Sequence, residues 1–146
     1  MLFGRKENRE KEARELPKTQ QRKVWGIRKK TLRMILETAK SSYPDEFAAV
    51  LRYDKRNGII TEIMLLPGSF SGERSATLQL HMLPIDYSVV GTVHSHPSRS
   101  NHPSEQDIHL FQKFGHTHII VCLPFDEDSW QGYDLRGEPI ELEVVD

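Results

Sequence analysis

The segment Tyr87–His96 limits the possible folds more than any other part of the chain. It is almost continuously apolar and Pro97 stops it, which is typical of a buried β-strand. Residues 118–123 have the same buried character, and residues 104–114 between them show the apolar spacing of a helix. Buried strands that alternate with helices predict a sheet with helices packed against it.

The rest of the chain repeats this alternation. A first helix is predicted before Pro44, where apolar residues recur close to helical spacing. Residues 46–53 and 59–66 form a predicted hairpin around the turn signal Asn57-Gly58. The apolar positions of the first helix are Ile27, Leu32, Ile35, Leu36 and Ala39. Further short strands are predicted at residues 76–80, 130–133 and 140–144. We expect an α/β domain with a mixed, mostly antiparallel β-sheet and a helix on each side.

The length and the cysteine content exclude several kinds of protein. The 146 residues are enough for one domain whose core needs no disulfide support. Cys122 is the only cysteine, which excludes an intrachain disulfide and a cysteine-based zinc site within one chain. No apolar run approaches the roughly 20 residues that span a membrane, and the apolar start is too short for a signal peptide. We therefore expect a cytoplasmic protein with no membrane partner.

The charges are distributed unevenly along the chain. Residues 1–30 hold 11 Lys or Arg against 4 Glu, which leaves 9 basic and 17 acidic residues in the remainder. We interpret residues 1–24 as a basic, flexible N-terminal extension and residues 25–146 as the folded domain. Residues 1–24 lack the interleaved aromatic residues that single-strand binders use, so a nucleic-acid partner is not expected.

A possible metal site is the most informative pattern in the sequence. On a strand, His94 and His96 point to the same face with Cα atoms about 6.6 Å apart, so their imidazoles can share one zinc ion. The loop after Pro97 is long enough to bring Asp107, in the first turn of the next helix, over the metal. Two histidines and one carboxylate leave a fourth position for water, as in catalytic zinc sites.

Simpler interpretations of these residues also exist. A His-x-His pair on a strand is more often a surface or core pair than a metal site. The spacing Ser104-x-x-Asp107 is also that of a helix capping box, an interpretation that is compatible with metal binding. Residue types and spacing do not identify a general base.

The same residues resemble the full signature of the JAMM (MPN+) metalloprotease family. The resemblance lies in Glu46, in His94-x-His96-Pro97 and in Ser104-x-x-Asp107. The chain is most similar to the small, stand-alone archaeal members, and the resemblance covers most of residues 27–146. It implies a JAB/MPN, cytidine-deaminase-like fold and one Zn²⁺ ion per chain. It also implies hydrolysis of bonds to the C-terminus of ubiquitin or a ubiquitin-like protein.

The resemblance further assigns a role to each residue of the signature. It implies that His94, His96 and Asp107 bind zinc. Glu46 matches the glutamate that takes a proton from the attacking water and returns it to the leaving amine. Ser104 matches the serine that stabilises the oxyanion. From the sequence without the resemblance, Glu46 would be an exposed residue at the start of a strand.

The chain looks too short for the insertions that ubiquitin-specific members use to grip ubiquitin. We therefore expect a simpler ubiquitin-like modifier, or a sulfur-carrier protein with a Gly-Gly C-terminus, and their conjugates as partners. The predicted activity is deubiquitinase-like or desampylase-like; the alternatives are processing of a sulfur-carrier protein and a non-catalytic MPN scaffold. The oligomeric state is left open, with a homodimer as one option.

His102 lies in the loop between the ligands and is a further cleft candidate. Trp130 and Tyr133 are expected to belong to the core. The remaining histidines are expected to be structural and not metal ligands: His81, His109, His116 and His118.

Overall fold

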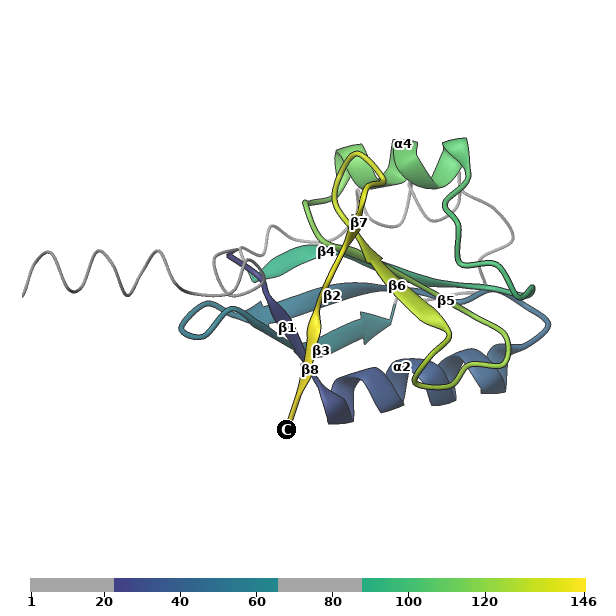
Figure 1. Ribbon diagram of the computed structural model, residues 1–146, viewed down its shortest axis with the longest axis horizontal. Helices are drawn as coiled ribbons and strands as arrows, with labels where there is room; N and C mark the ends of the chain where they lie inside the picture. The colour runs from purple at the N-terminus through teal and green to yellow at the C-terminus, as the bar shows by residue number, and fades with distance from the viewer. Residues whose placement is uncertain (1–22, 66–87) are drawn as a thin grey trace, which may run out of the picture.

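The computed structural model describes residues 23–65 and 88–146, and Figure 1 shows the arrangement of their helices and strands. The predicted strand 76–80 and nearly all of the predicted extension 1–24 lie outside these residues. The elements are β1 Gly26–Arg28, α2 Lys29–Ser42, β2 Ala48–Asp54, β3 Ile59–Leu65, β4 Val89–His96, α4 Glu105–Lys113, β5 His118–Cys122, β6 Trp130–Tyr133, β7 Pro139–Ile140 and β8 Glu143–Val145.

The strands form one 8-stranded sheet in the order β7-β6-β5-β4-β2-β3-β1-β8. Strand β4 lies inside the sheet, antiparallel to β2 and parallel to β5. The hairpin β2–β3 forms around the predicted Asn57-Gly58 turn, where both amides donate to the carbonyl of Asp54. Helices α2 and α4 lie on opposite sides of the sheet (Figure 1). The predicted mixed sheet with a helix on each side is confirmed.

Each helix covers its own part of the core. In α2, the buried apolar residues fall at spacings of three and four, so one stripe of the helix faces the sheet. These residues are Leu32, Ile35, Leu36 and Ala39. On the α4 side, Phe111 packs with Ile120 of β5 and Tyr133 of β6. Fully burying side chains of this size contributes roughly 1.5–3 kcal/mol each, so the two clusters hold both helices to the sheet.

Two sequence predictions of secondary structure were wrong. Ile27 was assigned to the first helix, but it lies in β1, where it pairs with Ile60 of β3 and Val144 of β8. The helix starts directly after Arg28, so no turn residue marks the change from strand to helix. Residues 140–144 were predicted as one strand, but they belong to two, β7 and β8.

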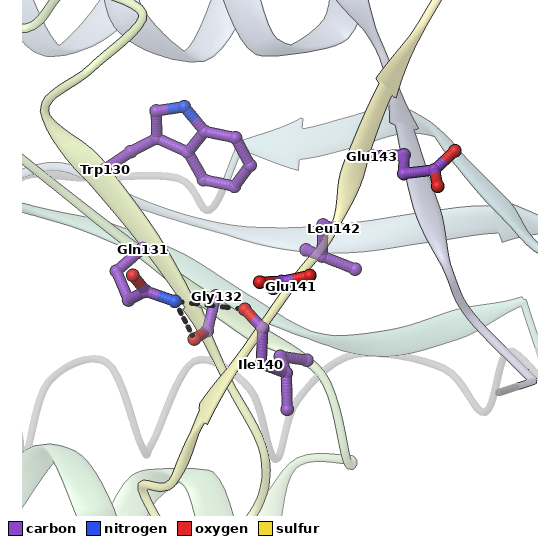
Figure 2. Close-up of a pocket in the computed structure, with 7 residues that line it drawn as sticks. All are labelled: Trp130, Gln131, Gly132, Ile140, Glu141, Leu142 and Glu143. Atoms are coloured by element: carbon purple, nitrogen blue, oxygen red, sulfur yellow. Dashed lines mark hydrogen bonds between the residues drawn. The ribbon is translucent and has the colours of Figure 1, made fainter. Parts of the chain in front are cut away.

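The sheet is strongly curled, because β7 and β8 are its two edge strands and yet are neighbours in the chain. The three steps from Ile140 to Glu143 span at most about 11 Å, so the edges must approach one another. A pocket of about 340 Å³ lies at this seam, lined by Trp130, Gln131 and Gly132 of β6 and by residues 140–143 (Figure 2). The Gln131 amide group donates to the carbonyls of Gly132 and Ile140 there. Among the residues that the structure describes, no helix is long and apolar enough to span a membrane.

Candidate metal centre

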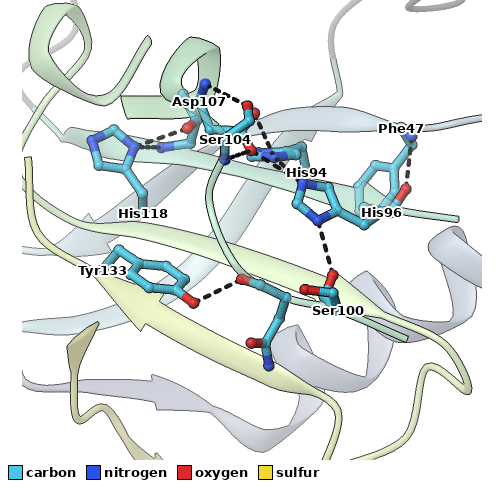
Figure 3. Close-up of polar contacts among 11 residues, drawn as sticks. Phe47, His94, His96, Ser100, Ser104, Asp107, His118 and Tyr133 are labelled. Atoms are coloured by element: carbon cyan, nitrogen blue, oxygen red, sulfur yellow. Dashed lines mark hydrogen bonds and ion pairs between the residues drawn. The ribbon is translucent and has the colours of Figure 1, made fainter. Parts of the chain in front are cut away.

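Two histidines of β4 form one side of the candidate site. Strand alternation puts His94 and His96 on the same face, as the sequence predicts, and their Nε2 atoms lie 3.1 Å apart (Figure 3). Their side chains are mostly buried, with 9% and 16% exposed. The strand belongs to the interior of the sheet, with β2 and β5 paired on its two sides, so the backbone that holds the two rings is rigid.

Helix α4 adds the carboxylate of Asp107. Ser104 is the N-cap: its Oγ accepts from the amide of Asp107 at 3.0 Å, and its own amide donates to Asp107 Oδ2 at 2.9 Å. This is the predicted capping box, and it orients the carboxylate while it satisfies two free amides of the helix N-terminus. The two oxygens of Asp107 then lie 3.2 Å from Nε2 of His94 and 3.1 Å from Nε2 of His96. The capping and ligand interpretations are therefore compatible.

The loop between the histidines and α4 sets the protonation of His96. Its Nδ1 lies 2.9 Å from the carbonyl oxygen of Ser100, which only accepts hydrogen bonds, so Nδ1 carries the proton. In the neutral ring, Nε2 is then unprotonated and presents its lone pair to the site. The Tyr133 hydroxyl donates to the carbonyl of Asn101 at 2.7 Å and holds the same loop on the sheet. Histidines that bind metal ions usually donate their other ring N–H to a group such as a backbone carbonyl, which orients the ring.

The three side chains fit a tetrahedral metal ion. With bonds of about 2.0–2.1 Å, a tetrahedral zinc site separates its ligand atoms by about 3.3 Å. The 3.1–3.2 Å separations among His94, His96 and Asp107 are close to that value. They are the only group of three or more His, Cys, Asp or Glu residues in the described part of the chain that is placed to hold a metal ion. Two nitrogens and one oxygen leave one tetrahedral position open.

The charges at the site favour a bound cation. Burial by itself would raise the pKa of Asp107, but hydrogen bonds that the two histidine rings donate when Nε2 is protonated outweigh it and hold that pKa well below its usual range. The hydrogen bond to Asp107 raises the pKa of His96, against the opposing effect of burial. A carboxylate that is ionised at neutral pH therefore faces the Nε2 atoms of two imidazoles, an arrangement that favours a cation between them.

Glu46 lies beside this group without belonging to it. Ala48 pairs directly with His94, and the Phe47 carbonyl accepts from the amide of Ser95 at 3.0 Å, which extends the pairing toward Glu46. Directly paired residues share a face, so Glu46 comes opposite His96 on the ligand side of the sheet. Its side chain is exposed, and its negative charge contributes to the raised pKa of His96. The Glu46 carboxylate is thus close enough to act on His96 through its charge.

Comparison with known proteins identifies the family. A family model described as prokaryotic homologs of the JAB domain matches residues 28–133, which is well over half of the chain. The chain belongs to this family. The predicted JAMM (MPN+) membership is thereby confirmed.

Individual relatives of this JAB-family chain agree with that result. A probable metalloprotease of Haloferax volcanii is 33% identical over 133 residues, which are 86% of this chain and 82% of the relative. A JAB1/MPN domain protein from Archaeoglobus fulgidus has a crystal structure with 47% identity and a TM-score of 0.67, covering 83% of this chain and 99% of its own. A further solved structure, described as JAMM, a metalloprotease-like zinc site in the proteasome and signalosome, has 43% identity and a TM-score of 0.67, covering 84% and 99%. These similarities and the group of three candidate ligands show that the chain is a JAMM-type metalloprotease.

The structure also places the other residues that the sequence analysis considered in this JAB-family chain. Tyr133 is buried, with 3% exposed, as predicted for a core residue. His102 is exposed on the loop before α4, and His81 lies outside the described residues. The sequence analysis did not predict the contact of the Ser100 carbonyl with His96. It expected His118 to be structural, and His118 is fully buried. A backbone carbonyl has no residue signature, whereas a histidine at the start of an apolar strand does signal buried hydrogen-bond partners.

Proposed function

We propose that this JAB-family chain is a zinc-dependent peptidase or isopeptidase. Its substrate would be the bond that follows the Gly-Gly C-terminus of a ubiquitin-like modifier. The observation that supports it most is the convergence of His94, His96 and Asp107. Three ligands leave one tetrahedral position open, and the charge of Glu46 acts on His96. Bound at these three residues, Zn²⁺ would polarise the scissile carbonyl and lower the pKa of a water molecule toward neutrality.

Glu46 is proposed to transfer the protons of the reaction. Its carboxylate accepts the proton of the attacking water and later donates it to the nitrogen of the leaving amine, which makes the amine a good leaving group. Its exposure suits this role, since the group must meet both water and substrate. Because it stands outside the cluster of three ligands, it can exchange a proton without loss of the metal.

Ser104 is proposed to stabilise the negative charge that develops on the carbonyl oxygen. Its hydroxyl oxygen accepts from the amide of Asp107, which leaves the hydroxyl proton to be donated. Since the same residue caps α4, its position relative to Asp107 is defined by two hydrogen bonds. A donor of this kind contributes about 3 kcal/mol to transition-state stabilisation in comparable sites.

The proposed substrate class is supported by the JAMM signature and by the relative whose zinc site is described as that of the proteasome and signalosome. A tail that ends in two glycines suits a site whose ligands are largely buried, because glycine allows a close backbone approach. The leaving group is either a lysine side chain or the next residue of a precursor. Release of a sulfur-carrier protein from such a precursor is the second candidate, since it uses the same bond geometry.

The substitution Glu46→Gln tests this assignment. It should retain one zinc per chain, because Glu46 is not a ligand, and lose turnover by on the order of 10²-fold or more, because the amide cannot accept the proton. Zinc content is measured on the purified chain, and turnover on a ubiquitin-like protein joined through Gly-Gly to lysine and, separately, to a linear extension, with and without a chelator. Glu37→Gln, an exposed glutamate of α2, is the matched control. Loss of zinc from Glu46→Gln, or an unchanged rate, would contradict the mechanism.

A further inference from the structure

A buried histidine joins the end of helix α4 to strand β4. His118, with no exposed surface, points its Nε2 at the carbonyl oxygens of Phe111 and Gly115, 3.1 Å from each. Its Nδ1 accepts from the backbone amide of Thr92 at 3.1 Å and from the Thr92 hydroxyl at 2.8 Å. Two carbonyls can only accept, so Nε2 carries the proton and both nitrogens of a neutral ring are satisfied.

Close backbone packing accompanies these hydrogen bonds. A Cβ atom on Gly91 of β4 would overlap the carbonyl oxygen of Thr117, and one on Gly115 would overlap the carbonyl oxygen of Val90. Gly115 also has a φ of 110°, which side-chain-bearing residues rarely adopt. We call Gly91, Thr92, Gly115 and His118 the α4–β4 junction. The backbone that follows α4 therefore has little freedom to move relative to β4.

The α4–β4 junction is close to the candidate metal centre. Phe111 follows Asp107 by four residues, about one helical turn, so the two side chains lie on the same face of α4. The Phe111 ring stacks on His118 with centroids 4.2 Å apart, and it contacts the His94 ring at 6.3 Å. Thr92, which donates to His118, precedes His94 by two residues on β4. A displacement of α4 relative to β4 would therefore move Asp107 away from the two histidines.

We propose that His118 is a positioning residue of the metal centre. It fixes the distance between α4, which supplies Asp107, and β4, which supplies His94 and His96. The Ser104 cap orients the Asp107 side chain within α4, but it does not connect the helix to β4. His118 provides that connection through hydrogen bonds at both of its ring nitrogens. The expected effect of His118 on turnover rests on the proposed function, whereas its expected effect on metal geometry does not depend on the substrate.

The test substitution is His118→Phe, which keeps a ring against Phe111 and removes both nitrogens. We expect zinc affinity to fall on the order of tenfold, as for other residues that orient metal ligands. Turnover should fall about tenfold or more with a much smaller change in KM, because a displaced ligand impairs the chemical step more than binding. Co²⁺ in place of zinc gives a visible spectrum that reports ligand geometry, and this spectrum should change in the variant.

Three further variants separate positioning from a loss of general stability. His118→Gln keeps a donor and an acceptor and should restore part of the affinity and of the Co²⁺ spectrum. Thr92→Val removes only the hydroxyl partner and should show a smaller change in the same direction if His118→Phe does not fold. Ile60→Val is a buried change on the α2 side of the sheet and should lower stability without altering the spectrum.

The outcomes distinguish this inference from the proposed function. If the unchanged chain binds neither zinc nor Co²⁺, or cleaves no Gly-Gly conjugate, the proposed function fails. If it binds and cleaves, but folded His118→Phe and Thr92→Val keep the original spectrum and affinity, the positioning role of His118 is wrong. An equal spectral change in Ile60→Val would also overturn it.

Discussion

Acid should destabilise the fold through His118 in a defined pH range. The pKa of His118 is lowered from 6.5 to about 4, mainly by burial and to a smaller extent by nearby His94 and His116. The hydrogen bonds to the carbonyls of Gly115 and Phe111 oppose this shift without cancelling it. A proton added at Nδ1 would face the amide of Thr92, so that two donors would meet.

The sign and size of the effect follow from the two pKa values. Between about pH 6.5 and pH 4 the unfolded chain binds a proton that the folded chain does not, so the free energy of unfolding falls as the pH falls. The contribution of neutral His118 to the free energy of unfolding is fully present above about pH 6.5 and is lost at about pH 4. A shift of this size corresponds to about 3 kcal/mol, which is a large part of the stability of a small domain.

The measurement is urea unfolding of the original chain and of His118→Gln at several pH values between 7 and 4, both with a chelator present. Metal release then affects neither protein. The other titrating groups contribute equally to both proteins, so their effects cancel in the difference in unfolding free energy. Asp107 also cancels because its pKa is lowered, so its stabilisation is lost only at more acid pH. The difference in unfolding free energy between the two proteins should fall by about 3 kcal/mol from pH 7 to pH 4. A difference that is constant with pH, or that grows in acid, would refute the neutral, buried state of His118.

Two further predictions concern the supports of the site. Ser104→Ala should lower the unfolding free energy by about 1 kcal/mol through loss of the helix cap and reduce turnover by on the order of 10²-fold. Ser104→Thr should restore the stability measured by thermal unfolding, and an unchanged rate in the alanine variant would argue against the oxyanion role. Gly91→Ala should cost more than about 3 kcal/mol in urea unfolding, because its Cβ has no room beside the carbonyl of Thr117. A stability within about 0.5 kcal/mol of the original would show that β4 and the segment after α4 are not packed so closely.

The parts of the structure that were predictable depend on local periodicity. The alternation of a strand puts His94 and His96 on one face wherever the strand lies, and the spacing of Ser104 and Asp107 is that of a capping box wherever the helix packs. The Asn57-Gly58 turn likewise forms from its own residues. For this reason the elements and the residues of the candidate metal centre could be named from the sequence, with help from the resemblance for Glu46.

The remaining features depend on partners far away in the chain. Ile27 is as suitable for a helix as for a strand, and it becomes part of a strand because Ile60 and Val144 pair with it. Residues 140–144 divide into two strands because the curled sheet brings its two edges together, which no local pattern records. The proton on Nδ1 of His96 is determined by the carbonyl of Ser100, a group that every residue possesses. Such contacts arise only when the folded backbone brings distant segments within hydrogen-bonding distance, and they decide the geometry in which the predicted ligands meet.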